Sequence, residues 1–244
     1  MTQESIAIER LLTFRPDSLA FSGGKDSVVI DDLMRKSGLS YHGFMNLTTV
    51  DPKVHLEFVR QHFSHIDMIR PEKGFSMYSL IVKKGLPSRK FRWCCEYLKE
   101  RIVKGSFVVM GVRWAESKKR QTRPMFHFHP RHKGVKVLNP IIDWSDRDVW
   151  EYLTANKLPI SPLYKEPYNL NRVGCVGCPV AGSRVTKEFR LFPEFRKYYI
   201  AAIRKRMEKG KFQEFQTPER VFEWWINQTS KAEFLAQMSF CMDN

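Results

Sequence analysis

The amino-acid sequence predicts an α/β protein with a mostly parallel sheet, followed by a C-terminal loop and a helical annex. Short apolar runs alternate with helical patterns through the first half of the 244 residues, which is typical of βαβ units. A glycine-rich stretch joins the first expected strand to the first expected helix. Four prolines then punctuate a loop-rich stretch between residues 159 and 179. We therefore expect one α/β domain over residues 1–155 and an annex packing on it over residues 156–244.

Each element follows from a local pattern. Pro52 suits the first turn of a helix, and Ser145 suits an N-cap because acidic residues follow it. The apolar run inside residues 106–111 is the clearest strand of the chain. Strands are predicted at residues 19–21, 41–46, 66–69, 106–111 and 135–138, and helices at residues 26–36, 52–63, 145–153, 194–209 and 218–227.

The composition is that of a globular protein. Hydrophobic residues make up 43% of the chain, which argues against disorder. No apolar run reaches the roughly 18 residues that a spanning helix needs, so we expect no association with a membrane. The first residues lack the basic and apolar regions of a secretory signal, and we therefore expect a cytoplasmic location.

The charge is strongly basic and unevenly spread. The chain carries 41 Lys and Arg against 26 Asp and Glu, a formal net charge of +15. Residues 83–136 contain 16 basic and 3 acidic residues, a net charge of +13. This basic block favours a polyanionic partner, either a nucleic acid or a nucleotide with several phosphates. A solvated basic surface without a specific partner is the alternative.

The glycine-rich stretch has the residue types of an anion-binding loop. Its glycines let the backbone approach a ligand closely, and Lys25 supplies a compact cation. Amides at the start of the following helix would complete a phosphate cradle. The spacing differs from the common P-loop, which places four residues between its first glycine and Gly-Lys-Ser/Thr. The candidate residues are Ser22, Gly23, Gly24, Lys25, Asp26 and Ser27.

This stretch resembles the pyrophosphatase loop, or PP-loop, of the N-type ATP pyrophosphatase superfamily. Five further segments narrow the resemblance to the phosphoadenosine phosphosulfate (PAPS) reductase family, and together they span residues 19–179. The segments are the Cys-Cys run at 92–99, Gly-x-Arg-x-x-Glu-Ser at 111–117, the Pro-Ile-x-Asp-Trp and Val-Trp-x-Tyr-Leu pair within 139–153, Pro-Leu-Tyr at 162–164, and the Cys-x-x-Cys run at 171–179. The resemblance implies a Rossmann-like sheet of the adenine nucleotide alpha hydrolase type.

The resemblance also implies a nucleotide site. Members bind ATP and release AMP and pyrophosphate, or they bind a sulfonucleotide at the same place. Residues 22–27 would then hold phosphates, with Lys25 as the catalytic cation and a magnesium ion offsetting the charge. Arg113 and Glu116 would lie in a substrate-binding loop, at the end of a strand where ligands bind in open α/β sheets. Thr49 and Asp51 would contact adenine or ribose, although Asp51 could equally cap the helix at residue 52.

Four of the five cysteines form a candidate metal centre. Cys94 and Cys95 are adjacent, and Cys175 and Cys178 form a Cys-x-x-Cys pair. Four thiolates can hold either a [4Fe–4S] cluster or one zinc ion. Adjacent cysteines are atypical of a structural zinc knuckle. The resemblance likewise implies the cluster, because cluster-bearing adenosine phosphosulfate (APS) reductases carry this pattern. Zinc, and free or redox-active thiols, stay open as alternatives.

Two enzymatic functions follow. We favour an ATP pyrophosphatase coupled to iron–sulfur-dependent sulfur transfer, acting in nucleic-acid modification, because the PP-loop is intact. The alternative is an APS or PAPS reductase that forms sulfite with Cys241 as nucleophile. Cys241 lacks the Glu-Cys-Gly-x-His surroundings usual in reductases, so an incidental cysteine is equally open. A sulfur donor or a thiol reductant protein would be a partner in either case. The sequence leaves open DNA against RNA, a homodimer against a monomer, and an inactive nucleotide-binding module.

Overall fold

The computed structural model describes residues 2–102 and 106–240, and these form two compact units that interleave along the chain. The first unit comprises the residues up to Asn46, Lys53–Ile69 and Arg101–Gly174. The second comprises Leu47–Pro52, Arg70–Glu100 and the residues from Cys175 onward. The sequence instead placed a single boundary near residue 155. The units are defined by contacts between distant segments, which a linear reading of composition does not reveal.

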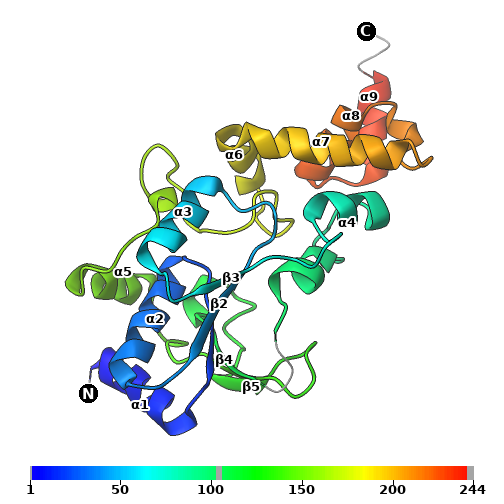
Figure 1. Cartoon of the computed structure of the whole chain (residues 1–244). Coiled ribbons are helices and arrows are strands. Elements are labelled where there is room, and N and C mark those ends of the chain that lie inside the picture. The colour runs from blue at the N-terminus through cyan, green and yellow to red at the C-terminus, as the bar shows by residue number, and fades with distance from the viewer. Residues whose placement is uncertain (1, 103–105, 241–244) are drawn as a thin grey trace. The chain divides into compact units, whose positions relative to one another are not determined.

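A six-stranded sheet forms the first unit, and its strand order is β3-β2-β1-β4-β6-β5 (Figure 1). All neighbouring strands run parallel except β5, which is antiparallel to β6. The predicted mostly parallel α/β fold is therefore confirmed. The strands are β1 Ser18–Ala20, β2 His42–Asn46, β3 Asp67–Ile69, β4 Phe107–Val109, β5 Phe126–Phe128 and β6 Lys136–Leu138.

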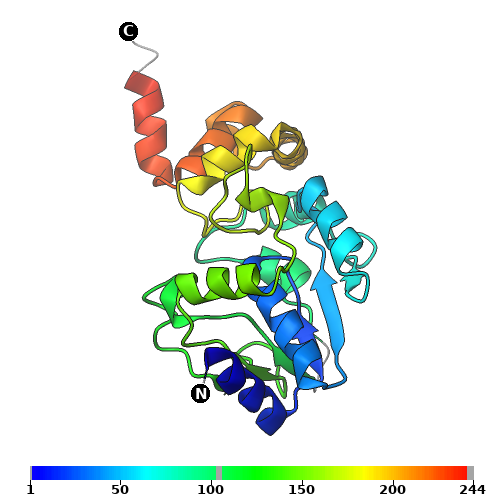
Figure 2. The ribbon, with the colours of Figure 1, turned by 90° about the vertical axis from the view of Figure 1, so that its left-hand side faces the viewer.

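The central strands and the helices of this unit share one apolar core. Leu19 of β1, Val108 of β4 and Val137 of β6 are fully buried, as expected for strands covered on both faces. Helix α2 contacts both α1 and α5 beside the sheet (Figure 2). The helices of the unit are α1 Gln3–Phe14, α2 Lys25–Ser37, α3 Lys53–His62 and α5 Asp146–Ala155, with the short 3₁₀ turns η2 Trp114–Glu116 and η3 Pro162–Tyr164.

The strand order determines where a ligand can bind. After β1 the chain crosses to β2 and β3 on one side of the sheet, and it then returns to β4 on the other side of β1. The loops that follow β1 and β4 therefore diverge at the point where the order reverses. Open α/β sheets bind ligands in the crevice at this point, beyond the carboxyl ends of the strands. The glycine-rich loop follows β1, and Arg113 follows β4.

Helices dominate the second unit. Helix α7 contacts α4, α6 and α8, and the aromatic side chains of Tyr199, Phe215 and Phe222 are buried among them. The Trp225 ring stacks on Tyr199 with centroids 5.1 Å apart, and its indole N–H donates to the Pro87 carbonyl at 2.7 Å. The elements are α4 Met77–Lys84, the π-helical turn η1 Cys95–Lys99, α6 Arg184–Leu191, α7 Pro193–Met207, η4 Gln213–Phe215, α8 Pro218–Asn227 and α9 Lys231–Phe240.

The expected helices at 194–209 and 218–227 correspond to α7 and α8, whereas α1, α4, α6 and α9 were not predicted. Within residues 2–102 and 106–240, none of the helices combines the length and the apolar character that crossing a bilayer requires.

The contact between β4 and α2 leads to a stability prediction. A Cβ at Gly111 would lie 2.9 Å from Asp26 Cβ and 3.1 Å from the Asp26 carbonyl carbon. We expect Gly111→Ala to lower the free energy of unfolding by about 1–3 kcal/mol, because the loop after β4 must move away from α2. Urea denaturation measures the change.

Gly174→Ala is the matched control, since among the described residues nothing lies within 4 Å of its added Cβ. We expect little change in stability there. Equal losses in the two variants would contradict close packing at Gly111.

Candidate nucleotide-binding site and cysteine centre

The loop after β1 is held in shape by its own hydroxyl groups and by a buried histidine. The Ser22 N–H donates to Ser27 Oγ at 3.2 Å, and Ser27 Oγ donates to the Gly24 carbonyl at 2.9 Å. Nε2 of the buried His55 lies 2.8 Å from the Ser22 carbonyl oxygen. Gly23 has φ +67°, and a Cβ there would lie 2.5 Å from His55 Cε1. Glycine is therefore required at this position for both reasons.

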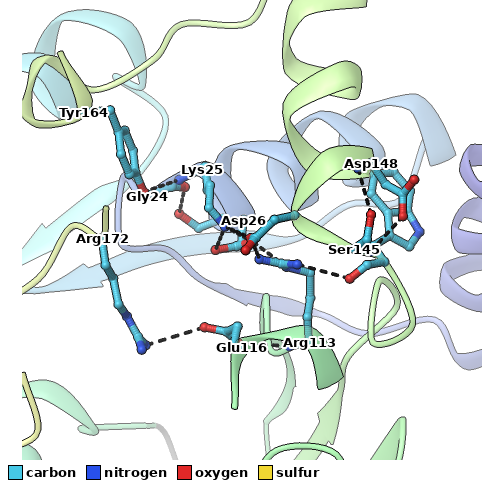
Figure 3. Close-up of polar contacts among 12 residues, drawn as sticks. Gly24, Lys25, Asp26, Arg113, Glu116, Ser145, Asp148, Tyr164 and Arg172 are labelled. Carbon is cyan, nitrogen blue, oxygen red and sulfur yellow. Dashed lines mark hydrogen bonds and ion pairs between the residues drawn. The ribbon is translucent and has the colours of Figure 1, made fainter. Parts of the chain in front are cut away.

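Four charged side chains join the loops that follow β1, β4 and β6 (Figure 3). Arg113 is fully buried, and its Nε and Nη2 lie 2.6 Å from Asp26 Oδ1 and from Asp146 Oδ1. Lys25 Nζ lies 2.9 Å from the same Asp146 oxygen and 3.2 Å from Asp26 Oδ1. Arg113 Nη1 also donates to the Trp144 carbonyl at 3.1 Å. The sheet's carboxyl edge is therefore cross-linked by ion pairs over three adjacent loops.

The pairing fixes the charge state of two of these groups. Burial opposes the charge on Arg113, but the Asp26 and Asp146 carboxylates outweigh it and raise the pKa of Arg113. A hydrogen bond from Lys25, helped by one from Arg113, lowers the pKa of Asp146 despite partial desolvation. Arg113 and Asp146 are therefore both ionised near neutral pH.

A pocket of about 390 Å³ opens beside these ion pairs. This volume is within the range typical of small-molecule sites. The lining combines charged, aromatic and amide side chains from the first unit: the four ion-paired residues together with Glu116, Trp150, Tyr164, Leu170, Asn171 and Arg172.

Guanidinium groups crowd around Glu116 at one side of the pocket. Glu116 Oε2 accepts the Arg113 backbone N–H at 3.0 Å and pairs with Arg120, and Oε1 lies 3.7 Å from Arg172 Nη2. Burial, together with the charges of Arg172 and Arg123, lowers the pKa of Arg120 to about 10. An anion bound here would relieve the mutual repulsion of these cations, so the arrangement favours phosphate or sulfate.

The four predicted cysteine ligands all lie in the second unit. Cys94 is buried, and Cys95, Cys175 and Cys178 are partly buried. A hydrogen bond with Cys95, burial, and the proximity of the thiols of Cys175 and Cys178 raise the pKa of Cys94. Burial raises the pKa of Cys175 to about 12. The four thiols therefore influence one another electrostatically. Among the described residues, no group of three or more His, Cys, Asp or Glu is arranged to hold a metal ion.

Buried groups fix the loop between Cys175 and Cys178. The Gly177 N–H donates to Glu188 Oε2 at 3.1 Å, and the Tyr199 hydroxyl donates to the Val176 carbonyl at 3.1 Å. Gly177 has φ +76°, and a Cβ there would lie 2.8 Å from Phe189 Cζ. Glycine at this position lets α6 and α7 pack against the cysteine loop.

The predicted adenine or ribose contacts, Thr49 and Asp51, belong to the second unit. Thr49 has φ +66°, and its Oγ1 accepts the Met77 N–H at 2.9 Å at the start of α4. The Asp51 carboxylate accepts the Thr48 N–H at 2.6 Å and the Thr48 hydroxyl at 2.8 Å, which closes a local turn. Their contact with a nucleotide, and a cap by Asp51, stay predictions.

The structure thus places Lys25, Asp26, Arg113 and Glu116 around one pocket in the first unit, and the four cysteines in the second unit. Cys241 lies outside the described residues. Sequence reasoning gave no site role to Asp146, His55, Tyr164 or Arg172. Asp146 looked like an ordinary first-turn acid of a helix, and Tyr164 and Arg172 stood inside recognised segments without an assigned role. No local pattern distinguishes His55.

The fold and the pocket define the class of protein: an α/β protein with a loop built for oxyanions at the switch point of its sheet. Residues 17–181 match the model of the phosphoadenosine phosphosulfate reductase domain. The chain belongs to this family. The family is enzymatic, acts in sulfur metabolism and binds adenine nucleotides such as APS and PAPS.

Individual relatives have low sequence identity to this chain. An uncharacterized protein of Methanocaldococcus jannaschii is 27% identical over 232 residues, which cover 86% of this chain and 46% of that protein. The adenosine 5′-phosphosulfate reductase of Allochromatium vinosum is 27% identical over 197 residues, 72% of this chain and 75% of that enzyme. The chain spans less than half the length of two archaeal relatives.

A solved structure shares the fold. The PAPS reductase of Candida auris in a phosphate complex aligns with a TM-score of 0.52 at 16% identity, over 72% of this chain and 88% of that one.

The lowered pKa of Asp146 predicts a pH-dependent stability. Its folded pKa lies below the ordinary 3.8, so its contribution is complete above about pH 5 and is lost as the pH falls through the folded pKa. We expect Asp146→Asn to lower the melting temperature most at neutral pH, with a difference from the unmodified protein that shrinks below pH 4. Thermal unfolding of both proteins between pH 3 and 7 measures this.

Glu57→Gln is the control, because Glu57 forms an exposed pair with Lys53 that should contribute little at any pH. A difference for Asp146→Asn that stays constant with pH would contradict the ion-pair argument.

Proposed function

We propose that this PAPS-reductase-family enzyme binds ATP at the PP-loop, releases AMP and pyrophosphate, and couples this reaction to iron–sulfur-dependent sulfur transfer. One observation carries the proposal: Lys25 of the intact loop and the buried Arg113 line a pocket that Arg172 also lines, and Arg120 pairs with Glu116 at its edge. A nucleotide without a pyrophosphate to release would not need the full cradle of amides and lysine.

The residues of the loop would act through positioning and charge. The amides of Gly23 and Gly24, together with Lys25, would hold the β- and γ-phosphates, and a magnesium ion bound with the nucleotide would offset their charge. An acceptor oxygen attacks the α-phosphorus, the α–β bond breaks, and pyrophosphate leaves with the electron pair. A sulfide-level nucleophile from a donor protein then forms a C–S bond at the adenylated carbon as its C–O bond to AMP breaks. Lys25 contributes by stabilising charge on the leaving group.

The acceptor that we propose is a nucleic-acid base. The basic block at residues 83–136 supports this, because a single small nucleotide does not require a net charge of +13. Within the block, Arg113 lines the pocket and Arg120 pairs with the pocket residue Glu116, where they would meet phosphate groups.

For the cysteines we infer a [4Fe–4S] cluster. The donor set is four thiols, and the raised pKa values of Cys94 and Cys175 mean that their thiolates need a nearby positive charge. Bound iron supplies that charge, because metal coordination deprotonates a thiol. Cys94, Cys95, Cys175 and Cys178 would be the ligands, and the cluster would add one-electron redox chemistry to the enzyme.

Iron analysis tests the cluster. We expect about four iron and four sulfide per chain in anaerobically prepared protein, and a large loss of both in Cys94→Ser. Cys241→Ser is the matched control and should keep its iron, since Cys241 is not among the proposed ligands. Zinc in place of iron, or no metal in any preparation, would refute the assignment.

The nucleotide reaction is tested with labelled ATP, in the presence and absence of nucleic acid. We expect AMP and pyrophosphate from the unmodified protein and at least a 100-fold slower release from Lys25→Ala, because the phosphates lose their cation. Iron content should be unchanged. Lys53→Ala is the control, an exposed lysine outside the pocket and the basic block, and should retain activity. Full activity in Lys25→Ala would exclude the PP-loop as the site of cleavage.

A sulfonucleotide reductase is the second candidate, and the similarity to the APS reductase of Allochromatium vinosum favours it. The same assay with APS, PAPS and a thiol donor separates the two functions. Sulfite formed from a sulfonucleotide, with ATP untouched, would establish the reductase. Loss of that sulfite in Cys241→Ser would then identify Cys241 as the nucleophile.

A further inference from the structure

The side chain of Tyr164 occupies an unusual place in the nucleotide pocket. It ends the turn η3, lines the pocket, and places its ring edge-on to Trp150 with centroids 5.3 Å apart. Its hydroxyl oxygen accepts the N–H of Lys25, in the first turn of α2, at 3.0 Å (Figure 3). The backbone N–H of Val173 also acts on this oxygen. Tyr164 is therefore tied to the PP-loop, although 139 residues separate it from Lys25.

These contacts determine which hydrogen bond the Tyr164 hydroxyl can form with a ligand. A phenolic oxygen accepts through its lone pairs and donates through a single proton. The two backbone N–H groups engage the oxygen, so the proton is the group left for a ligand in the pocket. Burial raises the pKa of Tyr164 to about 12, although the two N–H groups act in the opposite direction. The proton therefore stays on the oxygen at physiological pH. Hydrogen bonds accepted by an oxygen also strengthen its own donation.

We propose that Tyr164 is a substrate-binding residue whose hydroxyl group donates a hydrogen bond to an anionic oxygen of the anhydride held by the PP-loop. This inference rests on the proposed function of that loop. The ligand class is a phosphate–phosphate or phosphate–sulfate anhydride, because both present charged oxygens to the same amides and cations. Gly24 lacks a side chain next to the hydroxyl, where a Cβ would lie 3.3 Å from the Tyr164 oxygen, so an anion can approach.

A neutral donor is well suited to this position. Lys25 and Arg113 are already paired with Asp26 and Asp146, so part of their charge is used within the protein. Among the described residues no carboxylate is hydrogen-bonded to the Tyr164 hydroxyl, although the charge of Asp26 acts on it, and its oxygen is positioned by the Lys25 backbone N–H. It therefore adds a preorganised hydrogen bond without a further charge.

The test is Tyr164→Phe, which removes the hydroxyl and keeps the ring against Trp150. We expect the affinity for inorganic pyrophosphate, measured by calorimetric titration, to fall about 10- to 100-fold, as for a lost hydrogen bond to a charged group. The affinity for adenosine, which carries no phosphate, should stay unchanged. If Tyr164 had a purely structural role, Tyr164→Phe would lower the affinity for pyrophosphate and for adenosine alike, and this result would overturn the proposal. Unchanged or tighter binding of pyrophosphate would also overturn it.

Tyr198→Phe is the matched control. The Tyr198 hydroxyl also accepts a backbone N–H in the first turn of a helix, that of Tyr78 at 3.2 Å, but it belongs to the second unit. We expect this variant to bind pyrophosphate normally, and equal losses in the two variants would overturn the specific role of Tyr164.

Lys25→Ala separates this inference from the proposed function. If pyrophosphate still binds fully to Lys25→Ala, the proposed function itself fails. If Lys25→Ala loses pyrophosphate while Tyr164→Phe binds it normally, only the role of Tyr164 is refuted.

Discussion

The buried guanidinium of Arg113 is the interaction on which the rest of the site depends. A fully buried charge is tolerated only when it is paired and hydrogen-bonded, and Arg113 meets this condition through Asp26, Asp146 and the Trp144 carbonyl. Its partners belong to loops after β1 and β6, the two strands that flank β4. The strand order is therefore what makes the burial possible. Removing one carboxylate would leave the buried guanidinium with a single carboxylate partner and would destabilise the folded loops.

The same carboxylates determine how Lys25 can act. Asp26 and Asp146 hold its ammonium in one place, which removes much of the rotamer freedom of a long side chain before any ligand binds. An incoming phosphate must compete with these carboxylates for Lys25. The guanidinium groups of Arg120 and Arg172 favour the bound phosphate, because their mutual repulsion falls when an anion lies between them. Under the proposed function, this balance would favour a ligand with several charged oxygens.

Most of the sheet was predictable because its signals are local. Parallel strands covered on both faces are short continuous apolar runs, and the glycine loop carries its own chemistry in six consecutive residues. The elements and contacts that the sequence did not predict depend on weaker local patterns or on residues far apart in the chain. Helix α4 begins with a capping box whose reciprocal partner is Ser79, where the usual pattern has Glu or Gln. Asp146 has the sequence position of a helix-dipole acid, and its pairing with residues 33 and 121 positions away is visible only after folding.

The cysteine centre was recognisable for another reason: its residue type is rare and its spacing is specific. The sequence did not reveal which residues of other elements hold the cysteine loop in place. Glu188 and Tyr199 come from α6 and α7, and each holds the backbone of the Cys175–Cys178 loop by a single hydrogen bond. Burial raises the pKa of Glu188, and the Arg184 guanidinium at 2.7 Å opposes that shift.

The nucleotide pocket and the four cysteines therefore differ in how their charges are balanced. In the nucleotide pocket, carboxylates already compensate the buried Arg113, and Arg120 and Arg172 add further positive charge around Glu116. In the cysteine centre, burial and mutual proximity disfavour the thiolates that a metal requires. If the proposed cluster binds there, its iron would supply the missing positive charge, and its binding would release protons. The nucleotide pocket is preorganised by the protein's own ion pairs, whereas the cysteines would gain charge balance only from the proposed cluster.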